Sequence, residues 1–599
     1  MQTEMVAMSD GVRLATDVYL PEGAGPWPVI LERTPHGRAA PRPGESTPDA
    51  PEPRAAADLA GAFTAHGYAV VFQDCRGRGG SEGHFDPYFV EPEDGAATCA
   101  WINEQPWCDG HICTIGLSYC AHTQAALGSL DPPGLMAQVL DSGGFWDAWA
   151  CGVRQGGAFE LRQAMWTWRR ALNSPEAQTD PVLHAALAAE DMRAWFAALP
   201  WTQGHSPLRH LPEYEADFFE RLHHGRRDSY WRRAGIWAAG YHHRYSRADC
   251  VHLSAWFDPY AVSAIGNFTG LHAAGRGEQR LILGPWTHGA RSVRVAGDVD
   301  FGPAAVIDSW AGDWISYRLR VFDSVTRGVP NTEPPVRVFV MGGGTGRRTE
   351  HGYLDHGGRW ITADEWPVPE ARPATLYLHN DQRLTPAEPA ASATPLRFDF
   401  DPADPVPTIG GNFTSLEPLA MPGSFDQVTG PEVFGARPPY LPLSARHDVL
   451  AFQTAPLKQP LQVVGPVEIV LYVATDGPDT DFTVKLVDVH PANADYPRGY
   501  AMLLADTIQR LRYVDEPEQP RLHRPGEVVR VKFVLHTANL FAAGHRIRLD
   551  VSSSNFPKFD VNPNTGDPEG AARRRRVAVN TVFAEAARPS AVVLPVLAL

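Results

Sequence analysis

The sequence lacks the long apolar segments that membrane proteins need. No run in the 599 residues approaches the roughly 18 consecutive apolar residues that a membrane-spanning helix requires. Residues 1–10 also lack the cationic segment, followed by an apolar one, that marks a secretory signal. We therefore expect a cytoplasmic protein that has no membrane partner.

Cysteine is scarce, with seven residues in the chain. The number is odd and every cysteine precedes Val251, which favours reduced thiols over a disulfide framework. Their spacings match no zinc-binding pattern. The pairs His223-His224 and His242-His243 are no better candidates, because adjacent residues on a helix do not face one site. We therefore expect no metal and no other cofactor.

Basic residues are also fewer than acidic ones. The 69 acidic residues outnumber the 53 lysines and arginines, which gives a net charge of −16. This balance argues against nucleic acid as a partner. The run Arg573–Arg576 has no interleaved aromatic residues, so we expect a solvated loop or edge strand there. A small molecule is the expected partner, and the composition leaves a homo-oligomer open.

Ser118 lies in the most informative stretch of the chain. The apolar run Ile112–Ile115 ends at Gly116, the serine follows two residues later, and Ala121–Leu127 has the composition of a helix. A serine between a strand and a helix is the nucleophile elbow of α/β-hydrolases, in which a strained turn exposes the hydroxyl above the sheet. The usual G-x-S-x-G motif has a glycine where this chain has a cysteine, at position 120.

Two later segments offer partners for the serine. Cys250–Ala255 is predicted to be a buried strand and leads to Asp258, whereas Arg280–Gly284 is predicted to be the next strand and leads to His288. Open α/β sheets carry their chemistry at the carboxyl ends of strands. The order serine, carboxylate, histidine is that of α/β-hydrolases. We therefore predict a catalytic triad of Ser118, Asp258 and His288.

The chain divides into three predicted parts. Residues 146–240 are rich in helix formers and hold eight of the seventeen tryptophans, which favours a helical insertion between two strands of the sheet. From about residue 373 onward, short alternating strands separated by turns indicate a β-sandwich or jelly roll. The predicted boundaries are an α/β-hydrolase catalytic domain at 1–145 and 241–360, a helical cap at 146–240 and a C-terminal jelly-roll β-sandwich at 361–599.

With these residues in place, the chain resembles the X-prolyl dipeptidyl peptidase and cocaine-esterase-like hydrolases, the CocE/NonD family, over nearly its whole length. The resemblance implies an α/β-hydrolase domain, a helical cap and a C-terminal jelly roll of the galactose-binding-like kind. It also implies hydrolysis of esters or amides through an acyl-enzyme. The segments that carry the resemblance are Gln73–Gly79, Glu104–Gly110, Gly116–Tyr119, Trp256–Asp258, Gly284–His288, Asp479–Val489, Gly544–Leu549 and Ser553–Phe559.

The same resemblance implies an oxyanion hole. In the family, a tyrosine hydroxyl in a Thr-Pro-Tyr loop acts with a backbone N–H that follows the serine. This chain has His36 at the tyrosine position, in Thr34-Pro35-His36. We expect the backbone N–H of Tyr119 to be one donor and the imidazole of His36 to be the other.

The substrate is predicted to have an apolar acyl or aryl group. Relatives that act on α-amino acid esters carry acidic residues two and three positions after the catalytic aspartate, where this chain has Tyr260 and Ala261. A substrate with a free amine is therefore disfavoured, and so is dipeptidyl peptidase activity by that route. The residues that we expect to line the pocket are Trp166, Trp168, Phe257, Tyr260 and Trp286.

Three alternatives stay open beside a serine esterase or amidase. The same acyl-enzyme would serve an acyltransferase or a cyclase, in which an alcohol or amine replaces water. An X-Pro dipeptidyl peptidase is the second alternative. The third is a carbohydrate-binding protein with a vestigial catalytic domain, against which the presence of all three triad residues argues.

Overall fold

The computed structural model describes residues 1–599, and its first half is built on a mainly parallel sheet. The strand order is β1-β2-β4-β3-β5-β6-β9-β10-β13-β15, in which β1, β2 and β15 run antiparallel to their neighbours. The central strands are apolar and almost wholly buried, as parallel strands with both faces covered must be. Their bounds are β1 Gln2–Ala7, β2 Arg13–Tyr19, β3 Trp27–Thr34, β4 Ala69–Asp74, β5 Cys108–Leu117, β6 Leu135–Asp141, β9 Asp249–Phe257, β10 Gln279–Thr287, β13 Val336–Met341 and β15 Gly358–Ala363.

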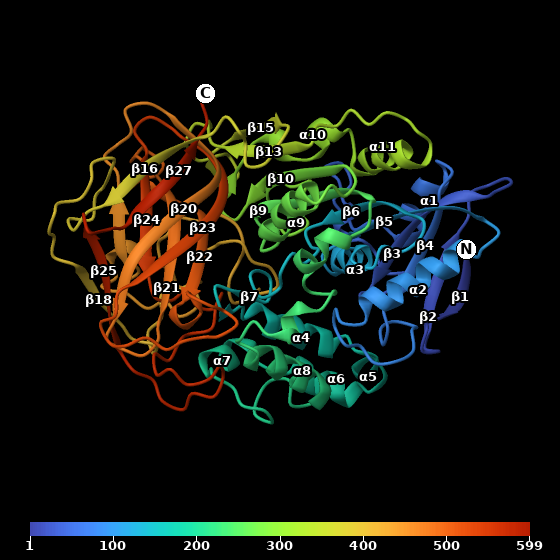
Figure 1. Cartoon of the computed structure of the whole chain (residues 1–599), viewed down its shortest axis with the longest axis horizontal. Helices are drawn as coiled ribbons and strands as arrows, with labels where there is room; N and C mark the ends of the chain where they lie inside the picture. The colour runs from blue at the N-terminus through green and yellow to red at the C-terminus, as the bar shows by residue number, and fades with distance from the viewer.

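Helices cover both faces of this sheet (Figure 1). Alternate residues of β3 point to opposite faces: Ile30 packs with α1 and α11 in one core cluster, whereas Val29 packs with α2 and α3 in another. Parallel strands need crossover connections, and these helices supply most of them. The helix bounds are α1 Ala56–Thr64, α2 Glu91–Asn103, α3 Tyr119–Gly128, α9 Ala261–Ala273, α10 Asp308–Ala311 and α11 Trp314–Thr326.

The segment between β6 and β9 is helical, as its composition predicted. It lies below the sheet in Figure 1, beside the β-rich half. Its aromatic residues, among them Trp201, Phe218 and Trp231, pack mainly in one core cluster, which also includes residues of both neighbouring parts of the chain. The elements are the hairpin β7 Arg154–Gln155 and β8 Ala158–Phe159, then α4 Arg162–Leu172, α5 Pro175–Thr179, α6 Pro181–Ala188, α7 Met192–Ala197 and α8 Pro212–His223, and the short 3-10 helices η2 Ser229–Arg232 and η3 Ala238–Arg244.

The second half of the chain is largely β-sheet. One group of strands surrounds the long strand β20, and a four-stranded sheet has the order β19-β24-β21-β22. Apolar side chains of both groups meet in the largest core cluster of the protein. The bounds are β16 Arg372–Leu378, β17 Leu384–Thr385, β18 Leu396–Phe400, β20 Leu461–Thr475, β23 Val529–Phe541, β25 Ala578–Glu585, β26 Arg588–Pro589 and β27 Ala591–Val596, and for the four-stranded sheet β19 Leu450–Gln453, β21 Asp481–His490, β22 Tyr500–Arg510 and β24 Arg546–Ser552.

The pairing of β13 with β23 joins the catalytic sheet to the β-rich half. Met341, at the end of β13, pairs with Asn539 of β23, so the parallel sheet continues into the strands around β20. A small three-stranded sheet is formed by residues that precede and follow β13 in the sequence. Its strands are β11 Val295–Ala296, β12 Val299–Asp300 and β14 Leu354–Asp355.

The structure bears on the expectations of free thiols and of no membrane-spanning helix. All seven cysteines are unpaired, which confirms the prediction of free thiols. None of the helices combines the length and the apolar character that crossing a bilayer requires.

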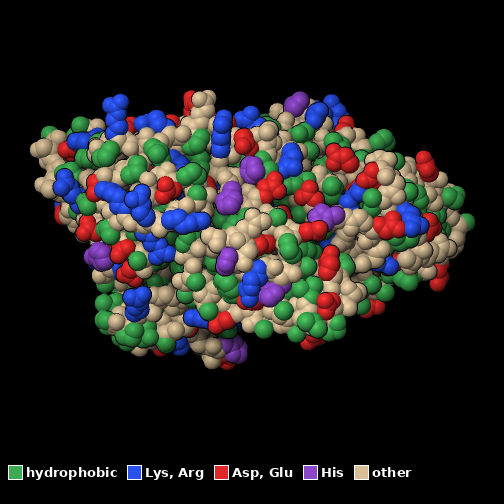
Figure 2. Space-filling view, turned by 90° about the horizontal axis from the view of Figure 1, so that it is seen from below, with side chains coloured by type: hydrophobic (Ala, Val, Ile, Leu, Met, Phe, Trp, Pro, Cys, Tyr) green, Lys and Arg blue, Asp and Glu red, His purple; other side chains and the backbone are tan.

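Figure 2 shows Lys and Arg side chains concentrated toward one end of the face that is seen from below. In the run Arg573–Arg576, Arg576 lies at the surface and forms an ion pair with Asp476 (2.8 Å).

Candidate active site

Ser118 lies at a strained turn between β5 and α3. Its backbone has φ 63° and ψ −117°, a positive φ that non-glycine residues rarely adopt. The turn is held by hydrogen bonds: the Ser118 N–H donates to the Asp141 carbonyl (2.9 Å), and the Ser118 carbonyl accepts from Ala121 N (2.9 Å). This is the geometry of a nucleophile elbow, which presents the serine hydroxyl at the carboxyl end of the sheet.

Two glycines make room for this turn. A Cβ added to Gly116 would come within 2.3 Å of Cys120 Cβ, and one added to Gly143 would come within 2.4 Å of the Ser118 carbonyl oxygen. The chain therefore tolerates a cysteine at position 120 because the opposing residue is a glycine. The elbow keeps its tight packing with one glycine fewer than the usual motif.

Asp258 and His288 contact each other at the ends of neighbouring strands. Asp258 follows β9 and is fully buried, and its Oδ2 lies 3.2 Å from Nδ1 of the partly exposed His288, which follows β10. Burial by itself would raise the pKa of Asp258. The charge and hydrogen bond of His288, the N–H of Tyr260 and the hydroxyl of Ser142 outweigh burial, so the pKa lies below its ordinary value. Asp258 is therefore ionised near neutral pH and orients the imidazole.

The serine and histidine loops are brought together by their neighbours in the chain. Gly289, which follows His288, lies so close to Leu117, which precedes Ser118, that an added Cβ would be 2.8 Å from Leu117 Cδ2. Residues that are 172 positions apart in sequence are thus side by side. The predicted nucleophile and the predicted base belong to loops that touch.

Two donors stand near Ser118. Tyr119 is the first residue of α3, so its N–H has no acceptor within the helix. Its side chain is fixed, because its hydroxyl donates to Glu91 Oε1 (2.8 Å) and accepts from Tyr88 N (2.9 Å). His36, in the loop after β3, lines the same cavity as Ser118.

His36 is accessible to water but stands within a cavity walled by protein. Desolvation is the main cause that lowers its pKa to about 4, and the charges of Arg78, Arg42 and His288 lower it further. The ring is therefore neutral at ordinary pH, with one N–H available for donation.

The cavity beside Ser118 has a volume of about 360 Å³. Its walls carry buried ion pairs, with Arg318 Nη2 2.6 Å from Glu45 Oε2 and Arg42 Nε 2.8 Å from Glu32 Oε2. These pairs leave no unbalanced charge on those walls. Ser118 and His36 line this cavity beside these ion pairs.

A larger cavity of about 660 Å³ lies between the helical segment and the β-rich half. Its lining includes Arg193 of α7 and the exposed Arg573–Arg575, but no member of the predicted triad. Size alone would favour this cavity as the binding site. The chemistry favours the smaller one, because Ser118, the predicted nucleophile, lines it together with His36.

Aromatic rings surround the elbow on the side of the helical segment. Trp166 of α4 stacks on Tyr88 (5.7 Å between ring centroids) and on Tyr119 (6.3 Å). Tyr260 packs 5.7 Å from the His288 ring and receives a hydrogen bond from Arg162 (3.1 Å). Of the five residues predicted to line the pocket, Trp166 and Tyr260 are thus next to the predicted triad.

The other three predicted pocket residues lie elsewhere. Trp286 is in the core of the sheet, where its Nε1–H donates to the Ala305 carbonyl (2.8 Å). Phe257 packs against Phe301 in the core shared with the β-rich half, and Trp168 donates to a carbonyl within the helical segment. We therefore correct these three assignments. For Phe257 and Trp286, nearness in sequence to Asp258 and His288 was a poor guide, because successive strand residues point to opposite faces of the sheet.

Sequence reasoning missed one contact of the site. Ser142 directly follows β6, and its hydroxyl contributes to the lowered pKa of Asp258. The rule that found Asp258 and His288 would have found Ser142 as well, since it also follows a buried strand at the carboxyl edge of the sheet.

No group of side chains near Ser118 has the spacing of a metal site. Of the histidine pairs considered above, His242 is buried and bonded to Asn267 (3.0 Å). A group with suitable spacing does occur where the two halves meet, at His356, Asp488 and His490.

The fold and the site define a class of protein. A strained serine between strand and helix, followed along the sheet by a bonded carboxylate and histidine, is the arrangement of an α/β-hydrolase. The comparisons with known proteins give the family within this class.

A family model described as X-Pro dipeptidyl-peptidase (S15 family) matches residues 10–290, and the model of the X-Pro dipeptidyl-peptidase C-terminal non-catalytic domain matches residues 327–593. The cocaine esterase of Rhodococcus sp. (strain MB1 Bresler) is 31% identical to this chain, over 99% of the chain and 98% of the esterase. The chain belongs to this S15 and cocaine-esterase family and is a serine hydrolase. The resemblance inferred from the sequence is thereby confirmed.

Solved structures share the fold over the whole chain. An aminopeptidase from the marine sediment archaeon Thaumarchaeota archaeon has a TM-score of 0.78 at 24% identity, with 100% of this chain and 96% of that one covered. An α-amino acid ester hydrolase has a TM-score of 0.76 at 24% identity, with 99% and 96% covered. Both likenesses concern the fold and its C-terminal, largely sheet domain.

Proposed function

We propose that the chain hydrolyses carboxylic esters or amides through an acyl-enzyme on Ser118. The Ser118 hydroxyl attacks the substrate carbonyl while His288 takes its proton through Nε2, and His288 returns that proton to the leaving group. Asp258 accepts a hydrogen bond from His288 Nδ1 and stabilises the imidazolium that forms. Water then attacks the acyl-enzyme: His288 takes a proton from the water and gives it to Ser118 Oγ as the acyl group is released as free acid. The contact of 3.2 Å between His288 and Asp258 is the observation that carries this proposal.

The negative oxygen of the tetrahedral intermediate would be bound by two N–H groups. One is the backbone N–H of Tyr119, whose side chain is fixed by Glu91 and by Tyr88 N. The other is the neutral imidazole of His36, which replaces the tyrosine hydroxyl of relatives. A preformed donor of this kind accelerates acyl transfer by about 10²–10³-fold.

The proposed substrate has an apolar or aryl acyl group. The aromatic rings of Trp166, Tyr88 and Tyr260 beside the elbow support this proposal, because such rings bind apolar groups and stack on aryl groups. Next to them is a cation, Arg162, whose guanidinium lies over the Tyr260 ring at 5.1 Å. A substrate ammonium would find no carboxylate at the Tyr260 position, so an X-Pro dipeptidyl peptidase activity is the less favoured alternative.

We also propose the domain division 1–145 with 241–360, 146–240 and 361–599. The middle part would be a helical cap, because it contacts both of the others. Trp166 stacks on Tyr119 of the catalytic domain, and Leu161 N donates to the Lys558 carbonyl of the β-rich domain (3.0 Å). The two packed groups of strands after residue 371 support a jelly roll for the last part.

The proposed location is the cytoplasm, and the proposed partner is a small molecule. Six of the seven thiols are buried and none is paired, which suits a reducing compartment. The net charge of −16 supports the absence of a nucleic-acid partner.

Acyl transfer to an alcohol or amine stays the second candidate, because both reactions share the acyl-enzyme. One experiment separates them: aryl and alkyl esters, aryl amides and Xaa-Pro anilides are assayed side by side, with and without a competing amine. Hydrolysis predicts free acid as the main product and aryl esters as the best substrates. Product that is mainly amide at low amine concentration would favour the transferase.

A further inference from the structure

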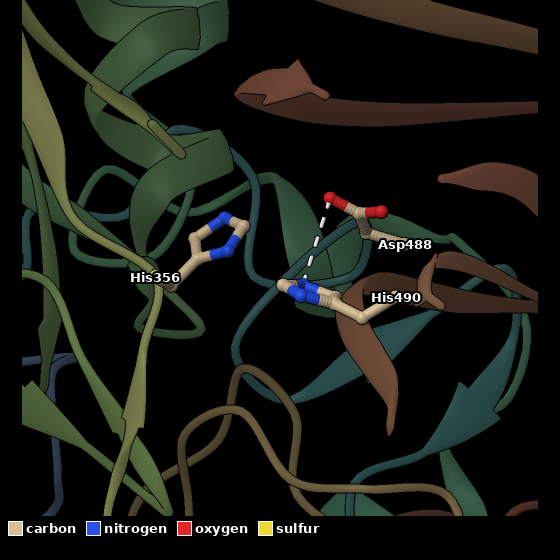
Figure 3. A group of neighbouring side chains, drawn as sticks. All are labelled: His356, Asp488 and His490. Carbon is tan, nitrogen blue, oxygen red and sulfur yellow. Dashed lines mark ion pairs between the residues drawn. The ribbon is translucent and has the colours of Figure 1, made fainter. Parts of the chain in front are cut away.

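A buried cluster where the two halves meet contains two imidazoles and a carboxylate that the proposed reaction does not use. His356 lies between β14 and β15, while Asp488 and His490 are alternate residues of β21 and point to the same side of that strand. All three are buried, and their ligand atoms lie within 4.8 Å of one another. Figure 3 shows the carboxylate and ring from β21 next to the His356 ring from the other segment.

His490 has no hydrogen-bond partner for either ring nitrogen. Its side chain is 3% exposed, and both Nδ1 and Nε2 are buried and unpaired. The nearest acceptor, Asp488 Oδ2, is 4.0 Å from Nε2, which is too long for a hydrogen bond. An imidazole with two unpaired nitrogens in the interior is rare, since buried polar atoms are nearly always bonded. The position calls for a ligand that the protein itself does not provide.

Hydrogen bonds from neighbouring side chains fix the tautomer of His356 and the orientation of the Asp488 carboxylate as metal binding requires. Asn539 of β23 accepts from His356 Nε2 (2.9 Å) through Oδ1 and donates to Asp488 Oδ2 (3.0 Å) through Nδ2. With its proton on Nε2, His356 keeps the lone pair of Nδ1 free. His545 donates from Nδ1 to Asp488 Oδ1 (2.8 Å). Such outer hydrogen bonds fix the tautomer and orientation of metal ligands.

We propose that His356, Asp488 and His490 bind one divalent transition-metal ion of the zinc class. Two imidazole nitrogens and one carboxylate oxygen are donors that suit Zn²⁺, with water in the fourth position. Donor atoms on one zinc ion lie about 3–4 Å apart, because each bond is about 2.0–2.2 Å long. The 4.0 Å between His490 Nε2 and Asp488 Oδ2 is already at the edge of this range. Side-chain movements of about 1 Å would place all three donors on one ion.

The ion would act as a tie within the fold rather than in the acyl chemistry. It links the segment between β14 and β15, which continues the catalytic sheet, to β21 of the four-stranded sheet. Asn539, which positions two of the ligands, is also the residue that pairs with Met341 where the two halves join. Binding would therefore stabilise the junction between the halves, because an ion that binds only the folded state raises stability.

Cobalt titration of chelator-treated full-length protein tests the site. Co²⁺ bound to nitrogen and oxygen donors absorbs visible light, so wild type should show a saturable spectrum at one Co²⁺ per chain, which added Zn²⁺ abolishes. His490→Ala and His356→Gln should lose this spectrum. The matched control is His536→Gln: His536 lies on β23 and has a buried, unpaired Nδ1 but is outside the cluster, so this variant should bind like wild type.

Asn539→Ala should weaken binding by about 10- to 100-fold without abolishing it, as expected for a residue that orients ligands. Zinc should raise the Tm of wild type and of His536→Gln but not of His490→Ala. A folded wild-type protein that binds no Co²⁺ stoichiometrically, or binding that survives both ligand variants, would overturn the proposal. These outcomes are independent of esterase activity, which the proposal does not require to change.

Discussion

Gly289 lies against Leu117, so close that a single added Cβ would approach Leu117 Cδ2 at 2.8 Å. Gly289 follows His288 and Leu117 precedes Ser118, so this contact sets the position of the histidine loop over the serine turn. Gly289 also has φ +71°, a conformation that other residues adopt only with strain. One glycine thus meets two demands, a left-handed turn and a close approach.

Gly289→Ala should therefore impair activity more than folding. We expect kcat/KM to fall by about 100-fold, because a displacement of about 1 Å between reacting groups is enough for such a loss. The free energy of unfolding should fall by about 1–3 kcal/mol. The control is Gly61→Ala in α1, where an added Cβ meets nothing within 4 Å and alanine should be neutral or stabilising. Unchanged kcat/KM in Gly289→Ala would show that the two loops are not coupled.

Asp258→Asn should lower kcat by about 10⁴-fold while the protein stays folded, because an amide favours the wrong tautomer of the neighbouring imidazole. Steady-state kinetics with a p-nitrophenyl ester measures this loss. Asp249→Asn is the matched control, since Asp249 lies at the other end of β9 and only accepts from Glu278 N (2.9 Å). Comparable activity in both variants would exclude Asp258 from the proposed role.

His36 should supply a donor that a tyrosine can replace. We expect His36→Ala to lose about 10²–10³-fold in kcat, and His36→Phe to lose a similar amount because it also lacks a donor. His36→Tyr, which restores the residue of relatives, should recover most of the activity. A loss below about threefold in His36→Ala, far under the range for an oxyanion donor, would show that Tyr119 acts without it.

The lowered pKa of His36 predicts how stability depends on pH. The folded protein protonates this ring near pH 4, whereas the unfolded chain does so near 6.5. Between these values the unfolded state binds more protons, so the contribution of His36 to stability falls as the pH falls. His36→Phe cannot titrate at this position. The Tm of wild type minus that of His36→Phe should therefore decrease from pH 6.5 toward about 4 and stay constant above 6.5. A difference that does not vary with pH would place the pKa at its ordinary value.

Much of the catalytic half could be predicted from sequence because its signals are local. The run Arg280–Gly284 lies within β10, and residues 336–341 form β13 as expected. Apolar, β-branched segments that end at glycine mark buried strands wherever they occur. Ser118, Asp258 and His288 could be proposed as a triad because parallel strands place their carboxyl ends at one edge.

The parts that could not be predicted depend on contacts between distant segments. Trp286 was expected in the substrate pocket but faces the core, since one position along a strand exchanges the two faces of the sheet. His356 and His490 are separated by 134 residues and carry no motif spacing, so only the folded chain reveals their cluster. The aromatic group around Trp166 likewise combines α4 with residues near α2 and α3.

The most direct test of the central claim is the site of covalent labelling by a fluorophosphonate. Mass spectrometry of the digested wild-type protein should find a single adduct, on the peptide that contains Ser118. Ser118→Ala should keep the circular dichroism spectrum and the Tm of a folded protein but take up no label. Labelling of Ser118→Ala at the wild-type rate, or an adduct on another residue, would contradict the proposal that Ser118 is the nucleophile.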